Sequence, residues 1–270
     1  MVDSRQTAQN SDNLLSQVHD GVLVLTINRL ALYNAWTSDL RDELAAKLVS
    51  ADADPDVIAA ILTGAGNRAF CSGQDLWELQ AFSDGSRIGP WLGRLANCYD
   101  AVRQFRKPLI AAVNGVAAGS GFQVTQFCDF VVAHPDVKMG QTEINSGLPS
   151  IFGTWLMWER VGRRAIELSL QGRLMSAEEA RNLGFIHQIV PQGEVLDTAI
   201  AVAKRLSGQP QVAYGLSKKA NRLLDEDRYR KAMAMAVEAY REAFDAGSPQ
   251  REIERFFERR RARKQQARAM

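Results

Sequence analysis

The segment LIAAVNGVAAGSGFQVTQFCD, Leu109 to Asp129, constrains the fold of this chain more than any other. Its opening apolar run predicts a short buried strand. Gly115, Gly119 and Gly121 then allow a turn that brings the backbone close to a bound group, and a helix-like pattern begins there. Because the first N–H groups of a helix lack intrahelical partners and carry the positive end of its dipole, this turn can hold an oxyanion.

Gln123 lies three residues beyond Ser120, on the same face of the expected helix. Proton transfer beside an oxyanion is commonly performed by a carboxylate, whereas an amide cannot take a proton at neutral pH. The segment therefore predicts a polar site in which an amide stands where a carboxylate is expected.

Composition disfavours several classes of protein. The 270 residues are 46% hydrophobic, enough for one large core, and no apolar run approaches the ~18 residues of a membrane span. The three cysteines and three histidines are scattered, which indicates reduced thiols in a cytoplasmic protein and no structural metal. We expect no membrane partner, and the polar stretch at residues 1–13 is interpreted as a leader without ordered structure.

Strand-like and helix-like runs alternate in the first two thirds of the chain, which favours an α/β core with crossover connections. A helix is expected behind the cap Thr37-Ser38-Asp39, and another toward Phe105. The expected strands are a hairpin of Leu14–Val18 and Val22–Ile27, followed by Val57–Thr63, Leu109–Val113 and Phe130–Ala133.

From Ile151 onward the patterns are helical, interrupted by one strand-like run at Phe185–Val190. Two long helices are expected at Gln211–Leu224 and Glu226–Phe244. We therefore predict an α/β core domain over residues 14–191 and a helical C-terminal lobe over residues 192–270.

Basic residues crowd the tail REIERFFERRRARKQQAR, Arg251 to Arg268, although the formal net charge is only +2. This pattern is typical of a solvated helix end, and it also suits a surface that binds the phosphates of an anionic ligand. Nucleic acid is not expected as a partner, because no aromatic interleaving or known motif accompanies the charges.

Four motifs in order carry a resemblance to a known family. They are FCSGQDLWEL (Phe70 to Leu79), AAVNGVAAGSG (Ala111 to Gly121), CDFVVA (Cys128 to Ala133) and GQTEINSGLPS (Gly140 to Ser150). Together they resemble the crotonase, or enoyl-CoA hydratase/isomerase, superfamily. The resemblance implies a ClpP-like spiral of ββα units with a helical trimerisation lobe, and a homotrimer or dimer of trimers. It also implies an acyl-CoA thioester substrate, with coenzyme A as part of that substrate and no tightly bound cofactor.

Two peptide N–H groups bind the thioester oxygen in this family, and the matching positions here are Gln74 and Ser120. Backbone donors suit a developing enolate because the fold fixes them in place. Ser120 replaces the usual glycine and keeps the N–H.

The acid–base positions differ from those of a standard hydratase. The resemblance matches its two glutamates to Gln123 and Glu143, and only Glu143 keeps a carboxylate. One carboxylate is sufficient to move a proton between the α and γ carbons of an enoyl thioester, as in the single-glutamate isomerases. The stretch around Glu143 also resembles the E-I-N-x-G-x-P segment of the hydroxycinnamoyl-CoA hydratase-lyases, which lack the first glutamate.

Contacts with coenzyme A are expected from the loop after the first long strand, from the Gly73 loop and from the last helix. The resemblance places them at Arg29, Ala31, Asn34, Gly73, Asp75, Phe256 and Arg259.

The sequence leaves the reaction open between isomerisation and hydration of an enoyl-CoA. A non-catalytic protein that binds acyl-CoA is an alternative, supported by Gln123 and by Leu32-Tyr33 where the family often has a charge. A hydrolase or lyase that uses the same oxyanion site is a further alternative.

Overall fold

The computed structural model describes residues 12–269 and begins with the predicted antiparallel hairpin, β1 (Leu14–His19) and β2 (Val22–Ile27). Within this part of the chain, β2 is followed by parallel strands in a six-stranded sheet of order β1-β2-β3-β5-β7-β10. The later strands of this sheet are β3 (Ala59–Gly64), β5 (Leu109–Val113), β7 (Phe130–Ala133) and β10 (Gln188–Ile189). The expectation for residues 1–13 falls mostly on residues 1–11, which lie outside the described residues.

A second, smaller sheet has no counterpart among the sequence predictions. Its strands in the described residues are β4 (Ala69–Cys71), β6 (Val116–Ala118), β8 (Lys138–Gly140) and β9 (Met175–Ser176). Each of β3, β5 and β7 is followed by a strand of this second sheet and then by a helical segment. The repeat is the spiral of ββα units that the predicted fold class requires.

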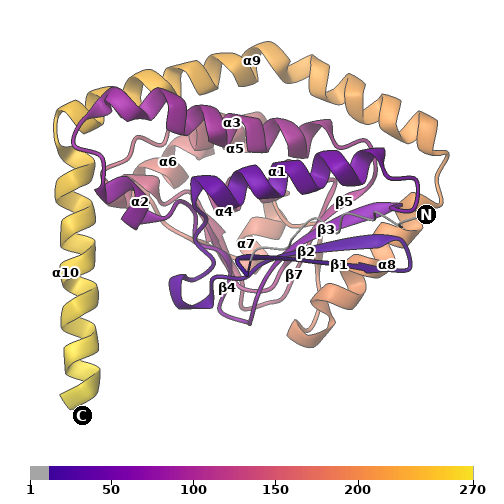
Figure 1. Ribbon diagram of the computed structural model, residues 1–270, viewed down its shortest axis with the longest axis horizontal. Helices are drawn as coiled ribbons and strands as arrows, with labels where there is room; N and C mark the ends of the chain where they lie inside the picture. Colours follow the sequence, from indigo (N-terminus) through magenta and orange to yellow (C-terminus); the bar gives the residue numbers. More distant parts are fainter. Residues whose placement is uncertain (1–11, 270) are drawn as a thin grey trace, which may run out of the picture.

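Helices cover both faces of the large sheet (Figure 1). On one face lie α1 (Ser38–Ala53) and α3 (Ile88–Gln104), and on the other lies α8 (Val195–Ser207). Along β5, Ile110 and Ala112 belong to the core under α8, whereas the alternate residues Leu109, Ala111 and Val113 belong to the larger core. Strands buried on both faces read as continuous apolar runs, which is why β5 was predictable.

The C-terminal half differs from the prediction at two places. The two expected long helices are one helix, α9 (Gln211–Asp245), because neither glycine nor proline interrupts residues 216–245. The strand expected at Phe185–Val190 shrinks to β10, since Phe185 and Ile186 turn into the core instead of pairing with β7. The other helices here are α5 (Ile151–Val161), α6 (Arg164–Gln171) and α7 (Ala177–Asn182).

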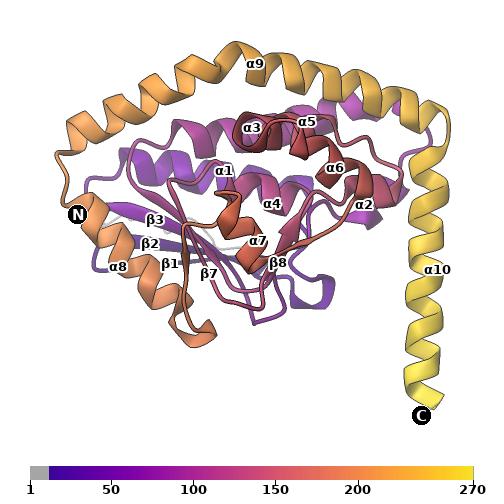
Figure 2. The same ribbon diagram turned by 180° about the vertical axis from the view of Figure 1, so that it is seen from behind.

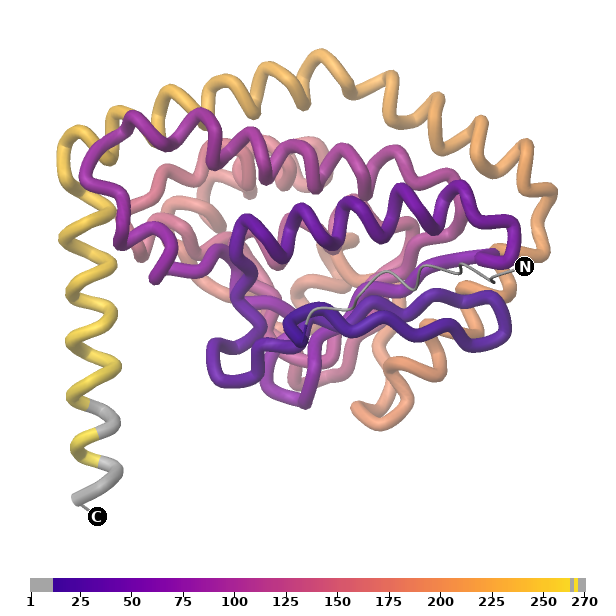
Figure 3. Tube along the Cα trace, in the orientation of Figure 1, coloured from indigo at the N-terminus to yellow at the C-terminus, as the bar shows by residue number. Residues whose placement is uncertain are grey.

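The last helix, α10 (Ser248–Ala269), leaves the end of α9 at a sharp angle and runs along one side of the core (Figures 1 and 2). The turn between them contains Gly247 with a φ of 69°. The chain trace shows α10 passing the short helix α2 (Leu76–Gln80) (Figure 3). None of the helices in residues 12–269 combines the length and apolar character needed to cross a bilayer. The domain boundary at residue 191 stays a prediction.

Candidate active site

Two loops leave the small sheet side by side. β4 and β6 are parallel neighbours, so the loops that follow them emerge at the same edge. Gly73 and Gly119 lie in these loops with φ values of 98° and 54°, which strain other residues. A Cβ atom on Gly73 would lie 2.9 Å from the carbonyl oxygen of Ala118, so only glycine permits this approach.

Trp36 holds the first loop in place. Its N–H donates to the Gly73 carbonyl at 3.0 Å, and its carbonyl accepts from the Asp75 N–H at 3.1 Å. This parallel bridge uses groups on either side of the Gln74 N–H and leaves that N–H directed away from Trp36. Ser120 begins the helix α4 (Ser120–Thr125), so its own N–H has no partner within the helix. Gln74 and Ser120 both line one cavity.

Glu143 lies against the second loop, at the start of a 3-10 turn that spans Glu143–Ser146. A Cβ atom on Gly119 would lie 3.6 Å from the Cγ and 3.9 Å from the Oε1 of Glu143. Burial raises the pKa of Glu143 to about 7, while polar contacts with Gln123, Tyr240 and Gln141 limit the rise. A carboxyl group whose pKa lies near neutral can both take and return a proton.

Gln123 lies behind Glu143 and is 1% exposed. Its Nε2 donates to Glu143 Oε1 at 3.0 Å and to Gln141 Oε1 at 3.1 Å. Its Oε1 accepts from the Tyr99 hydroxyl at 2.7 Å. An ionised carboxylate is only an acceptor, so Glu143 fixes which end of the amide faces it. The amide is thus engaged at both ends.

Two tyrosines complete this network without any sign in the sequence motifs. Tyr99 comes from α3 and is buried beside Gln123. Tyr240 comes from α9 and is buried, with its hydroxyl in polar contact with Glu143. Burial and the carboxylate together raise the Tyr240 pKa well above its ordinary value, so its hydroxyl stays protonated. A helical aromatic far from Glu143 in sequence is ordinarily interpreted as core.

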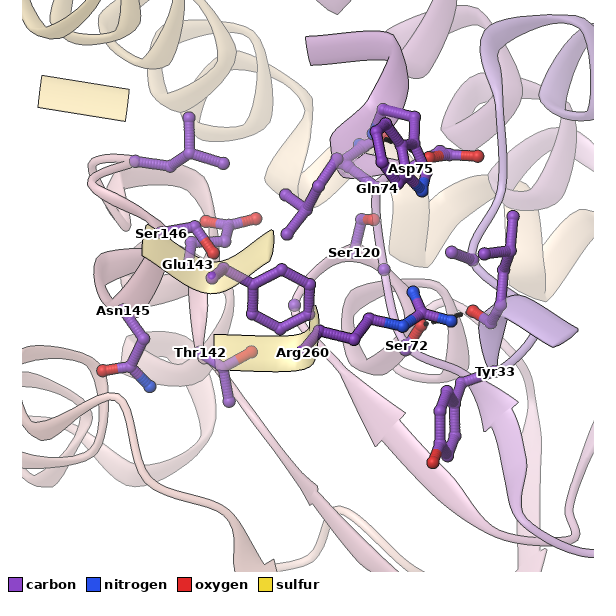
Figure 4. A pocket seen from close by; sticks show the side chains of 18 of the residues that line it. Tyr33, Ser72, Gln74, Asp75, Ser120, Thr142, Glu143, Asn145, Ser146 and Arg260 are labelled. Atoms are coloured by element: carbon purple, nitrogen blue, oxygen red, sulfur yellow. Dashed lines mark hydrogen bonds between the residues drawn. The ribbon is translucent and has the colours of Figure 1, made fainter. Parts of the chain in front are cut away.

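The cavity lined by Gln74, Ser120 and Glu143 has a volume of about 900 Å³ and is walled on one side by α10 (Figure 4). Trp77 of α2 and Phe257 of α10 both line it and stack on each other, with ring centroids 3.8 Å apart. Arg260 of α10 donates to the carbonyl of Ala31 at 3.1 Å. The last helix is therefore part of the site within a single chain.

The residues predicted to contact coenzyme A fall into two groups. Those that line the cavity are Ala31, Gly73, Asp75, Phe256 and Arg259. Arg29 and Asn34 are absent from this lining among the described residues.

Arg29 and Asn34 instead support the loop from behind. Arg29 pairs with Asp75 at 2.8 Å. Asn34 is 1% exposed and donates to the carbonyls of Ala65 and Ala69 at 3.0 and 2.7 Å. Their part in binding coenzyme A stays a prediction.

The cavity also has a cation that the sequence did not indicate, Arg68. Arg259 and Arg260, from the basic tail, line the cavity together with it. The Arg68 guanidinium lies 4.1 Å from the centre of the Tyr33 ring and hydrogen-bonds the Tyr33 hydroxyl. Arg68 stands five residues before Gly73, in a stretch that carries no recognisable phosphate motif. An anionic ligand would meet these guanidinium groups.

Residues 17–267 match the family model for enoyl-CoA hydratase/isomerase. The chain belongs to this family. It is 37% identical over 212 residues to the 1,2-epoxyphenylacetyl-CoA isomerase of Escherichia coli, covering 77% of this chain and 80% of that protein. It is 32% identical over 253 residues to the short-chain-enoyl-CoA hydratase of Clostridium acetobutylicum, covering 92% and 96%.

Solved structures of the family have the same fold. An enoyl-CoA hydratase/isomerase from Mycobacterium paratuberculosis superposes with a TM-score of 0.83 at 24% identity, over 91% of this chain and 98% of that chain. An enoyl-CoA hydratase from Bacillus anthracis superposes with a TM-score of 0.73 at 29% identity, over 84% and 90%. The crotonase fold is therefore confirmed, and the chain is an enzyme of the hydratase/isomerase type. Because the relatives include both isomerases and hydratases, membership of the family leaves the exact reaction open.

Proposed function

We propose that this enzyme isomerises an enoyl-CoA thioester by moving one proton between its α and γ carbons. Glu143 takes the proton from one carbon, the electrons of that C–H bond move toward the thioester oxygen, and the same carboxyl returns the proton to the other carbon. The N–H groups of Gln74 and Ser120 hold the oxygen while it carries negative charge. No co-reactant is consumed.

The hydrogen bonds of Gln123 are the observation that favours isomerisation over hydration. Hydration assisted by two groups requires both to orient one water molecule, and one of them must accept a hydrogen bond from it. The Oε1 of Gln123 already accepts from Tyr99, and its Nε2 already donates to Gln141 and Glu143. Gln123 is thus better suited to orient the carboxylate of Glu143 than to hold water.

Glu143 has no competitor for the proton in the described part of the cavity. The other acidic residue in its lining is Asp75. That carboxylate pairs with Arg29 at 2.8 Å and caps α2 by accepting from the Trp77 N–H at 2.9 Å. The Asp75 carboxylate is therefore already engaged by Arg29 and by the start of α2.

We propose that coenzyme A enters as part of the substrate, with its phosphates near Arg68, Arg259 and Arg260. Guanidinium groups bind phosphate through paired donors. The stacked rings of Trp77 and Phe257 offer an apolar wall beside these cations.

Hydration is the second candidate, because the chain matches 96% of the length of the short-chain-enoyl-CoA hydratase of C. acetobutylicum. In that reaction Glu143 alone would take a proton from water. The two reactions differ in mass balance, since hydration adds one water and isomerisation adds nothing.

The test is to incubate the purified enzyme with a 3-enoyl-CoA and a 2-enoyl-CoA and to follow products by mass spectrometry and chromatography. We expect isomers of unchanged mass and a loss of turnover in Glu143→Gln. Glu159→Gln is the matched control, because Glu159 lies in α5 and pairs with Arg228 at 2.9 Å. A hydrated product with no isomer would contradict the proposal, as would full activity in Glu143→Gln.

We also propose that the protein assembles as a trimer or a dimer of trimers. Apolar side chains on α9 support this, since Val212, Leu216 and Leu224 are 79%, 60% and 85% exposed in the single chain. Light scattering of the purified protein would measure the assembly, and a monomer at micromolar concentration would contradict this proposal.

A further inference from the structure

Ser120 carries a hydroxyl where the oxyanion site uses only a backbone N–H. The indole Nε1 of Trp36 donates to the Ser120 Oγ at 2.8 Å. Trp36 and Ser120 are both 0% exposed, so water does not compete for this contact. An indole N–H is only a donor, which makes the serine oxygen the acceptor and leaves its own proton to point elsewhere.

That proton has no acceptor among the described residues. Tyr99 approaches the Ser120 carbonyl oxygen, at 3.4 Å, rather than the hydroxyl. Serines inside helices usually donate to a carbonyl one turn earlier, as Ser169 does to the carbonyl of Ala165 at 2.8 Å. Ser120 is the first residue of α4 and has no earlier helical turn to use. A buried donor without an acceptor destabilises the protein unless a bound group accepts its hydrogen bond.

The hydroxyl lies on the same side of Ser120 as the N–H. A Cβ atom on Gly73 would be 3.6 Å from the Ser120 nitrogen and 3.6 Å from its Oγ. Both donors of Ser120 are therefore close to the loop that carries Gln74, and both residues line the cavity (Figure 4). A thioester oxygen bound between the two loops would lie within reach of this hydroxyl.

We propose that the Ser120 hydroxyl is a third hydrogen-bond donor to the thioester oxygen, oriented by the indole of Trp36. This inference rests on the proposed thioester function of the same site. The indole occupies one lone pair of the hydroxyl, and the free proton is aimed at the oxygen on which negative charge develops. Trp36 thereby organises both sides of the site, because its backbone also holds the loop of Gln74.

The first test separates donation from structural support. Ser120→Ala keeps the backbone N–H but removes the hydroxyl, and it also leaves the buried indole N–H of Trp36 without an acceptor. Trp36→Phe combined with Ser120→Ala removes both partners, so no polar group is left unpaired. If the hydroxyl acts on the substrate, both variants lose about 10²-fold in kcat with a small change in KM, since one lost donor costs about 10²- to 10³-fold.

The second measurement reports on the carbonyl directly. A chromophoric thioester, para-dimethylaminocinnamoyl-CoA, absorbs at longer wavelength as donors polarise its carbonyl group. We expect a red shift when the probe binds to the wild type. The shift should be smaller in Ser120→Ala, and the double variant should show the same reduced shift. Ser120→Cys, which keeps an acceptor for the indole but has a weak S–H donor, should behave similarly and serves if the alanine variant fails to fold.

Two outcomes would overturn the inference. One is a double variant that regains wild-type kcat and red shift, because the loss in Ser120→Ala would then come from the stranded indole. The other is a Ser120→Ala variant as active as the wild type. Ser169→Ala is the control for a buried serine outside the cavity and should leave both readouts unchanged. A wild type that neither turns over enoyl-CoA nor shifts the probe would instead refute the proposed function itself.

Discussion

The pH dependence of kcat/KM is the first consequence of a catalytic Glu143. The carboxyl must be ionised to take a proton, and burial raises its pKa to about 7 from an ordinary value of 4.5. With a pKa near 7, roughly 3% of the enzyme is active at pH 5.5 and about 90% at pH 8. We therefore expect kcat/KM to rise about 30-fold over this range, whereas a glutamate with its ordinary pKa would give a change of about 1.1-fold.

The assay is isomerisation of a 3-enoyl thioester under first-order conditions from pH 5.5 to pH 8. An acyl thioester of N-acetylcysteamine, which has no phosphate, is the control that excludes titration of coenzyme A. Gln123→Leu removes a hydrogen bond that lowers the pKa of Glu143, so its rising limb should move to higher pH. A kcat/KM that does not change with pH in the wild type would refute the reasoning. So would a Gln123→Leu variant whose kcat/KM rises over the same pH range as that of the wild type.

Three further outcomes follow from the same geometry. Glu143 holds its proton to higher pH in the folded than in the unfolded protein, so the free energy of unfolding of the wild type falls as pH rises from 4.5 to about 7. In urea unfolding, Glu143→Gln should therefore be more stable than the wild type by up to roughly 3 kcal/mol at pH 8 and should differ little at pH 4. Gln123→Glu places a second carboxylate where an amide nitrogen lies 3.0 Å from Glu143, and we expect a hydrated product by mass spectrometry; its absence at every pH would count against the role given to Gln123. Gly121→Ala would put a Cβ atom 2.2 Å from the Cys71 carbonyl, so we expect loss of activity and a lower melting temperature, and an unchanged variant would contradict the described loop packing.

The central strands of the large sheet, β2, β3, β5 and β7, were predictable because they are apolar runs bounded by glycines or turn residues. The small sheet was not, since strands such as Val116–Ala118 are too short to show a period and lie between glycines that suggest a turn. The break expected at Asp225 does not occur, because polar residues inside a helical pattern do not by themselves end the helix.

The residues of the site also divide into those that the sequence predicted and those that it did not. Glycine loops in a recognisable order led to Gln74, Ser120, Gln123 and Glu143, which the structure brings together around one cavity and the network behind it. Partners that reach this site from elsewhere in the sequence could not be inferred, because nothing in a sequence tells a packed aromatic from one that donates a hydrogen bond. These partners are Trp36, Tyr99 and Tyr240.

Exchange of the α protons of a saturated acyl-CoA in D₂O, followed by proton NMR, tests the central claim most directly. Such a thioester can be neither isomerised nor hydrated, so exchange reports only the transfer of a proton to and from the α carbon. We expect exchange by the wild type and a loss of about 10²-fold or more in Glu143→Gln, the contribution expected of a general base. Equal exchange by the wild type and Glu143→Gln would contradict it.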